Sequence, residues 1–158
     1  MNYRIPAVLV AGLMCTAVWA GDAGVSYPDG YRDWHHVKSM VIQPGHALEN
    51  PFGGIHHVYA NKKAQQGLKT GNYADGAVLV FDLLQYNEGG HALQEGERKL
   101  VGVMQRNAKR YKETGGWGFE GFAGNSHDQR LVTDGGKSCF ACHAPQEKSG
   151  FVFSQPRN

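Results

Sequence analysis

The sequence predicts a mainly β fold, an antiparallel sheet accompanied by a few short helices, with an α+β arrangement as the remaining option. Short apolar segments, four or five in number, recur at the spacing of β-hairpins. Glycine is abundant, with 22 residues, as the turns of such a sheet require. Long helices with a heptad pattern of apolar residues are missing, so a four-helix bundle does not fit.

The first half of the chain is predicted to contain a loop, two strands and a short helix, at 21–33, 37–42, 55–60 and 62–68. The first segment is rich in Gly, Asp, Tyr and Pro, which favours irregular structure. Turn signals, Pro44-Gly45 among them, separate the two strands. Asn61 can cap the helix, and Gly71 can end it.

The second half is predicted to add three strands at 76–84, 98–105 and 117–122, a loop at 87–97 and a short helix at 108–113. In the first of these strands Leu79 and Phe81 share one face, while Val80 lies on the other. Apolar residues on both faces indicate a central strand that is covered on two sides. A last helical turn is expected to begin at Gly136 or Ser138.

The N-terminus has the layout of a secretory signal. A positively charged start with Arg4 precedes a mostly apolar stretch, and Ala20 is the small residue that signal peptidases prefer. We therefore expect residues 1–20 to be a signal peptide and 21–158 to be one exported, soluble domain. Charge is nearly balanced, with 16 basic and 14 acidic residues in the whole chain. Nucleic acid and membranes are therefore not expected as partners.

Two cysteines one helical turn apart precede a histidine, in the order Cys139-Phe140-Ala141-Cys142-His143. This is the attachment pattern of c-type haem. The spacing brings the two thiols within reach of the vinyl groups on one porphyrin edge and directs the histidine under the ring to bind iron. Since such haems are attached outside the bacterial cytoplasm, haem c and the signal peptide together predict a periplasmic protein. A zinc site and a surface disulfide are the alternatives.

The other side of the iron decides what a haem does. No Met or His follows the motif, so the candidates for a sixth ligand all lie upstream: Met40, Met104, His35, His36, His46, His56, His57, His91 and His127. The methionines lie in apolar alternating segments, where this residue usually fills the core. Adjacent histidines point to opposite faces of a strand, and most are expected to be surface or satisfied core residues. We expect an open sixth position, with a six-coordinate, methionine-ligated electron carrier as an alternative.

Several segments of the exported domain form a further pattern, in this order: Tyr27-Pro28 with Tyr31-Arg32-Asp33-Trp34, Val58-Tyr59, Asp75-Gly76 with Val78 and Val80, Trp117 with Phe119, and Val152-Phe153-Ser154-Gln155. Their order and spacing, together with the haem motif, resemble the cytochrome P-460 family and its cytochrome c′-beta branch. The resemblance covers nearly the whole domain. It implies a mostly antiparallel β fold, a homodimer and a five-coordinate haem with His143 on the proximal side.

One departure separates the branches of this family. Hydroxylamine-oxidising members tether a lysine covalently to the porphyrin, and at the corresponding position this chain has Phe81. A phenyl ring cannot form the amine crosslink, so the sequence is most similar to the c′-beta branch, which has an aromatic distal pocket. The resemblance therefore implies that Phe81 and Phe52 cover the distal side of the haem.

An apolar cap favours some ligands over others. It offers dioxygen no hydrogen bond, and it offers peroxide no acid or base. Nitric oxide and carbon monoxide need less polar help, so we expect the chain to bind nitric oxide, and carbon monoxide, for scavenging, transport or sensing. A hydroxylamine-oxidising or peroxidase-type enzyme is the alternative, and a crosslink from Lys62 or Lys63 would support hydroxylamine oxidation.

Overall fold

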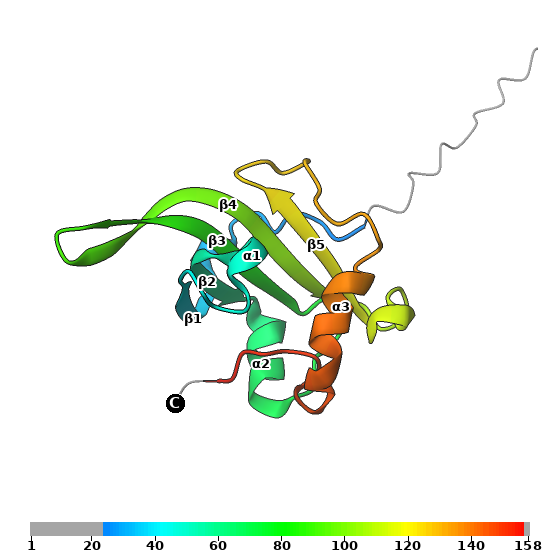
Figure 1. Cartoon of the computed structure of the whole chain (residues 1–158). Coiled ribbons are helices and arrows are strands. Elements are labelled where there is room, and N and C mark those ends of the chain that lie inside the picture. Colours follow the sequence, from blue (N-terminus) through cyan, green and yellow to red (C-terminus); the bar gives the residue numbers. More distant parts are fainter. Residues whose placement is uncertain (1–23, 157–158) are drawn as a thin grey trace, which may run out of the picture.

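An antiparallel five-stranded sheet forms the centre of the computed structural model, which describes residues 24–156 (Figure 1). The strands follow one another in the order β1-β2-β3-β4-β5, and they span His35–Ile42, Gly54–Ala60, Val78–Gly89, Ala92–Arg106 and Trp117–Ala123. Each pairs antiparallel with the next along the chain. The predicted mainly β fold is confirmed. The predicted signal peptide, 1–20, lies outside the described residues.

The helices are short. The α-helices α1, α2 and α3 span Glu49–Phe52, Lys62–Thr70 and Lys137–His143, and the 3₁₀ helices η1, η2 and η3 span Tyr31–Asp33, Lys112–Thr114 and Ala144–Ser149. Asn61 caps α2 as predicted, because its side chain accepts a hydrogen bond from the Ala64 amide at 2.9 Å. Gly71, at φ 75°, ends the helix. No helix within residues 24–156 combines the length and apolar character that crossing a bilayer takes.

Strand β3 contributes to two apolar layers, one on each face of the sheet. Leu79 belongs to the layer beneath α2 and α3, whereas Val80 belongs to the layer beneath the N-terminal segment that includes Val25 and Tyr31. Both β3 side chains are buried. The central strand covered on two sides is therefore confirmed. The layer beneath α3 concerns the site, because it also contains the haem-motif residue Cys139.

The predicted loop at 87–97 is wrong. Strands β3 and β4 continue through this region as one hairpin, with Gly89 paired to Ala92. Gly90 and His91, at φ 58° and 59°, make the two-residue turn, whose left-handed backbone matches the twist of a hairpin. Figure 1 shows this arm extending past the other strands. Its residues face solvent on both sides, so they lack the apolar alternation by which a strand is recognised.

The predicted helix at 108–113 is also wrong, apart from the turn of η2 at its end. Side-chain oxygens bind the backbone here instead. The Asp75 carboxylate accepts a hydrogen bond from the Ala108 amide at 2.8 Å, and the Asn107 side chain accepts one from the Arg110 amide at 3.0 Å. The Asn107 bond is local, and such bonds compete with helix formation and favour turns, whereas the Asp75 bond comes from a distant segment and holds the Ala108 backbone in place.

Candidate haem site

Helix α3 begins at a carboxylate cap. The side chain of Asp134 accepts hydrogen bonds from the backbone amides of Gly136, at 2.9 Å, and Ser138, at 2.8 Å. These bonds hold the pKa of the Asp134 carboxyl below its ordinary value. Gly136 adopts φ 84°, a conformation that glycine tolerates. The cap therefore sets the start of the helix that carries the Cys139–His143 motif.

The three motif side chains lie on one face of α3, because positions i, i+3 and i+4 of a helix are neighbours. Cys139 is half-buried against the apolar layer of the sheet, and burial raises the pKa of its thiol. Cys142 is exposed. Both cysteines are free, so the surface disulfide considered above is not formed. Two thiols one turn apart remain open to a covalent partner.

His143 is held by the segment that follows η3. Its Nδ1 lies 2.8 Å from the carbonyl oxygen of Phe151, which fixes the Nδ1–H tautomer as a donor and leaves Nε2 with a lone pair. Phe151 itself has φ 67°, an unusual conformation for a bulky residue, and its carbonyl is the one that His143 uses. Rings flank the imidazole: Phe119 at 5.2 Å and Phe153 at 4.9 Å between centroids. Burial lowers the pKa of His143, which favours the neutral ring.

The sheet face beneath α3 contains a strip without side chains. Phe81, Gly102 and Gly121 pair side by side across β3, β4 and β5. A Cβ atom at Gly102 would lie 3.4 Å from the Cβ of Phe81, and one at Gly121 would lie 3.4 Å from the Cβ of Leu131. The two glycines therefore leave bare backbone between Phe81 and Leu131. A flat, bare surface of this kind suits a planar ring system.

Phe81 and Phe52, the two residues that the resemblance implied as the distal cap, are in contact. The two rings pack edge to face, with centroids 5.7 Å apart and an interplanar angle of 79°. Phe52 closes helix α1, and the following residue is held by Lys99, whose Nζ donates to the Gly53 carbonyl oxygen at 2.7 Å. Residues separated by nearly thirty positions thus form one aromatic pair. The structure brings the two predicted cap residues together.

His56 also joins this pair, a contact that the sequence analysis missed. Its ring lies 4.4 Å from that of Phe81 between centroids, and the residue is only 5% exposed. Burial lowers the pKa of His56 to about 4, with smaller contributions from the positive charges of Lys38 and His57. His57 lies on the opposite face of the sheet, so the prediction that these adjacent histidines point to opposite faces is confirmed. The alternation of a strand places His56 on the same face as the apolar residues Val58 and Ala60, and this pattern could have identified His56 as the buried histidine.

The two methionines considered as sixth ligands both lie on the face of the sheet that carries Phe81. Met40 pairs with His56, and Met104 packs against the apolar layer between Leu79 and Phe119. Both are half-buried. Their position is compatible with a role as core residues, which is how methionine in an apolar strand usually behaves.

The residues on this face fit a covalently attached haem. Two free thiols, an imidazole with one nitrogen engaged, and a bare strip lined by phenyl rings provide attachment, iron binding and apolar contact. Two large apolar side chains near these groups are exposed: Leu131, next to Gly121, by 46%, and Phe153, which packs on His143, by 52%. A bound apolar group could cover them. Among residues 24–156 no three His, Cys, Asp or Glu side chains gather as a metal site, so nothing there supports the zinc alternative.

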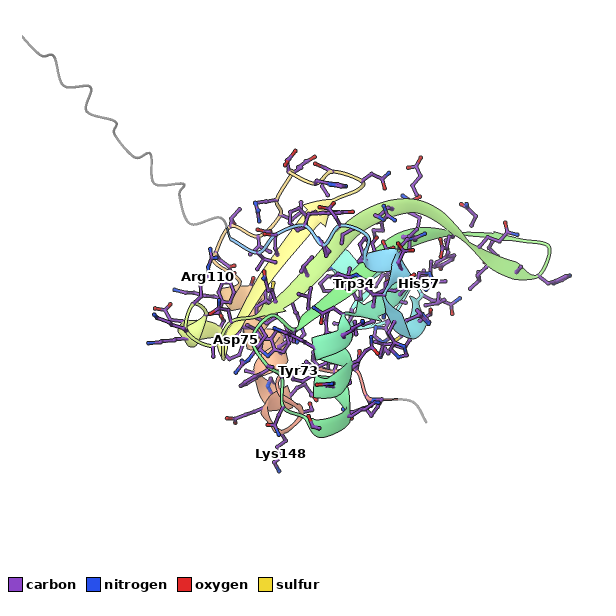
Figure 2. The ribbon with its side chains drawn as sticks, turned by 180° about the vertical axis from the view of Figure 1, so that it is seen from behind. Trp34, His57, Tyr73, Asp75, Arg110 and Lys148 are labelled. Atoms are coloured by element: carbon purple, nitrogen blue, oxygen red, sulfur yellow. The ribbon has the colours of Figure 1, made fainter. Side chains whose placement is uncertain are left out.

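The apolar packing that holds α2 next to α3 is centred on Tyr73. Its ring lies between α2 and α3 (Figure 2) and packs on Trp117 with centroids 5.1 Å apart. Gly67 of α2 and Gly150 after η3 leave the room for this ring, because a Cβ atom at either position would overlap it. The haem motif is thereby tied to the body of the domain on both sides, through α2 and through the sheet.

Comparison with known proteins agrees with this geometry. The sequence model of the family described as Cytochrome P460 matches residues 28–154, which include all five strands and the whole Cys139–His143 motif. No curated protein sequence matches the chain. With the match extending over most of its length, the chain belongs to the cytochrome P460 family of haem proteins.

Proposed function

We propose that residues 21–158 form a haem c domain, exported to the periplasm by a signal peptide at residues 1–20. Cys139 and Cys142 would hold the porphyrin through thioether bonds, and His143 would bind the iron through Nε2. The free thiols and the hydrogen bond from His143 Nδ1 to the Phe151 carbonyl support this assignment. When bound, the haem supplies an iron that takes up small diatomic ligands.

The ligand we propose is nitric oxide, with carbon monoxide as a second ligand, bound for scavenging, transport or sensing. The observation that carries this proposal is the edge-to-face contact of Phe52 with Phe81. Two phenyl rings keep water from the distal side, and their bulk slows the entry of ligands. Neither ring can donate a proton, so peroxide cleavage gains no general acid from them.

The proximal side is proposed to be adapted to the same ligand. His143 is oriented by a neutral hydrogen bond to a backbone carbonyl, and no carboxylate within residues 24–156 pairs with its ring to increase its basicity. A histidine held in this way forms an ordinary iron bond. His143 would therefore hold the iron through a bond that a strong ligand such as nitric oxide could compete with.

The first experiment is the visible absorption spectrum of the purified ferrous holoprotein before and after nitric oxide is added. An ordinary high-spin c-haem spectrum that changes to a five-coordinate nitrosyl spectrum is the expected result. A strongly red-shifted ferrous Soret band would instead indicate a crosslinked porphyrin and a hydroxylamine-oxidising enzyme. A low-spin spectrum at neutral pH, lost on replacing Met40 or Met104, would establish the electron carrier.

The family also implies a homodimer, which we propose for this chain. Sedimentation equilibrium of the mature holoprotein tests it directly. The expected mass is twice that of one exported domain with its haem, and a single-domain mass at micromolar concentration would contradict the dimer.

A further inference from the structure

His56 is a polar side chain in an otherwise apolar neighbourhood. On strand β2 it pairs with Met40 of β1 and Leu83 of β3, and its ring packs on Phe81. Phe81 in turn packs on Phe52. The imidazole therefore lies directly beside the aromatic pair proposed to cap the haem, on the face of the sheet that α3 covers.

The ring of His56 has an unused hydrogen-bonding atom. Its Nδ1 is buried, and within the described part of the chain it finds no partner. Buried polar atoms without partners are rare in native proteins, because each loses its bonds to water without compensation. An apolar residue of similar size would pack between Met40 and Leu83 without this penalty. The histidine is therefore poorly explained as a core residue alone.

The charge state of the ring is set by its surroundings. Burial is the main effect and disfavours the charged ring, and Lys38 of β1 and His57 of β2 add smaller effects in the same direction. A neutral imidazole carries one N–H donor and one lone pair. The neutral ring can thus donate a hydrogen bond to a small polar molecule or accept one from it, but it carries no positive charge.

We propose that His56 is the polar group of the distal pocket, and that its unpartnered ring nitrogen forms a hydrogen bond with a small ligand beside Phe81. This inference rests on the proposed haem function and adds a specificity-determining residue to it. Phe52 and Phe81 limit the size of a ligand, whereas His56 increases the affinity for a ligand whose outer atom is polar.

Two probes separate these contributions. Azide binds ferric haem and has a polar outer nitrogen that can accept a hydrogen bond. Carbon monoxide binds ferrous haem and reports the local polarity through its C–O stretching frequency. The holoprotein is compared with His56→Leu, which removes the polar nitrogens, and with His56→Gln, which restores a polar group. His57→Leu is the matched control, since His57 lies on the opposite face, 2.7 Å from the Glu95 carboxylate.

The His56→Leu change is expected to raise the dissociation constant for azide by about threefold to tenfold, the range that one hydrogen bond contributes. It should also shift the C–O stretching frequency upward, as a less polar pocket requires. His56→Gln should recover part of both effects, and His57→Leu should change neither. Dissociation constants and frequencies within the range of the control would overturn the inference.

Two further outcomes are decisive. A low-spin ferric spectrum that His56→Leu converts to high-spin would place His56 on the iron itself and overturn the proposal of a hydrogen bond to a ligand. Failure of the ferrous holoprotein to bind carbon monoxide or nitric oxide would instead contradict the proposed function. If His56→Leu does not fold, nitrogen NMR of the histidine rings in the wild-type protein replaces it. Addition of azide should then move the His56 ring resonances, and unchanged resonances would overturn the inference.

Discussion

Single side chains determine which ligands the proposed pocket admits. Phe81 has contacts on two sides, with the edge-to-face ring of Phe52 and the tilted ring of His56. The resemblance to the cytochrome P-460 family implies that Phe81 takes the place of the crosslinking lysine found in hydroxylamine-oxidising members. Its position in β3 is fixed by the backbone pairing with Val58 and Gly102. The sheet therefore fixes the position from which the ring projects.

Replacing Phe81 by alanine should open the pocket. We expect the association rate of carbon monoxide with the ferrous holoprotein to rise by about tenfold, equivalent to removing about 1.4 kcal/mol from the entry barrier. The half-buried ring should also contribute about 2 kcal/mol to stability. Flash photolysis measures the rate, and urea unfolding measures the stability. Leu93→Ala at the hairpin tip, where Leu93 is 37% exposed, is the control; equal rates in both variants would contradict the cap.

His56 should make stability depend on pH. Its pKa in the folded protein is lowered from 6.5 to about 4, so between these values the unfolded chain binds a proton that the folded chain does not. Stability therefore falls as the pH drops from about 6.5 to about 4, by about 3 kcal/mol from this residue. Unfolding by urea at pH 7.5 and pH 4.5 measures the effect. The difference between the two pH values should be smaller in His56→Leu, and an equal difference would contradict burial of a neutral ring.

At the scale of elements, the site depends on the packing of α2 and α3 around the ring of Tyr73, which lies between them. The ring of Tyr73 packs on Trp117, whose indole N–H donates to the Gly150 carbonyl oxygen at 2.9 Å. Burial raises the pKa of Tyr73 to about 12. Gly67 of α2 leaves room for the Tyr73 ring, because it has no side chain there. A glycine inside a nine-residue helix would otherwise be unfavourable.

Gly67→Ala tests this packing because two effects oppose each other. Helix propensity alone predicts stabilisation by about 1 kcal/mol. The added Cβ would overlap the Tyr73 ring, which Trp117 and Gly150 hold on its other sides, so we expect a net loss of about 1–3 kcal/mol. Thermal unfolding of the holoprotein measures the change. Gly89→Ala, where no atom lies within 4 Å of the new Cβ, should be nearly neutral, and stabilisation by Gly67→Ala would contradict the contact.

At the scale of the whole molecule, the two faces of the sheet have different contents. The face away from α3 contains a fully buried carboxylate, Asp82, which accepts hydrogen bonds from Arg32 at 2.9 Å and Arg98 at 2.7 Å. These bonds tie the N-terminal segment to the centre of the sheet. The face beneath α3 contains the haem motif, the glycine strip and exposed apolar side chains. The first face is covered by residues of the N-terminal segment, whereas we expect the proposed haem to cover the apolar residues of the other face.

Loss of the haem should therefore weaken the fold. A double variant, Cys139→Ser with Cys142→Ser, prevents covalent attachment. We expect it to lose at least about 3 kcal/mol of stability, as is typical when a tightly bound partner is removed. It should also bind a hydrophobic dye near Leu131 and Phe153, which remain uncovered. Asn87→Ser in the hairpin arm is the control, and equal melting temperatures of the double variant and the holoprotein would contradict the prediction.

Much of the architecture could be predicted from local patterns. The apolar alternation of 37–42, 55–60 and 117–122 predicted β1, β2 and β5, because each of these strands has an inward face. Asn61 and Gly71 predicted the ends of α2 through capping chemistry that needs only neighbouring residues. The arm at 87–97 could not be predicted in this way. Its strands are stabilised by pairing with each other in solvent, so no apolar pattern marks them.

The sequence by itself determined the chemistry at the proposed attachment site, because Cys139, Cys142 and His143 are neighbours on one helical turn and their spacing is local. It also predicted the fold class and, through resemblance, that Phe52 and Phe81 cover the distal side of the proposed haem. Only the tertiary structure decided that His56 is buried against the Phe81 ring and that its Nδ1 has no hydrogen-bond partner among residues 24–156, since its neighbours come from β1 and β3. Burial and hydrogen-bond satisfaction depend on what other strands bring, and this is why the sequence alone could not distinguish a satisfied histidine from an unsatisfied one.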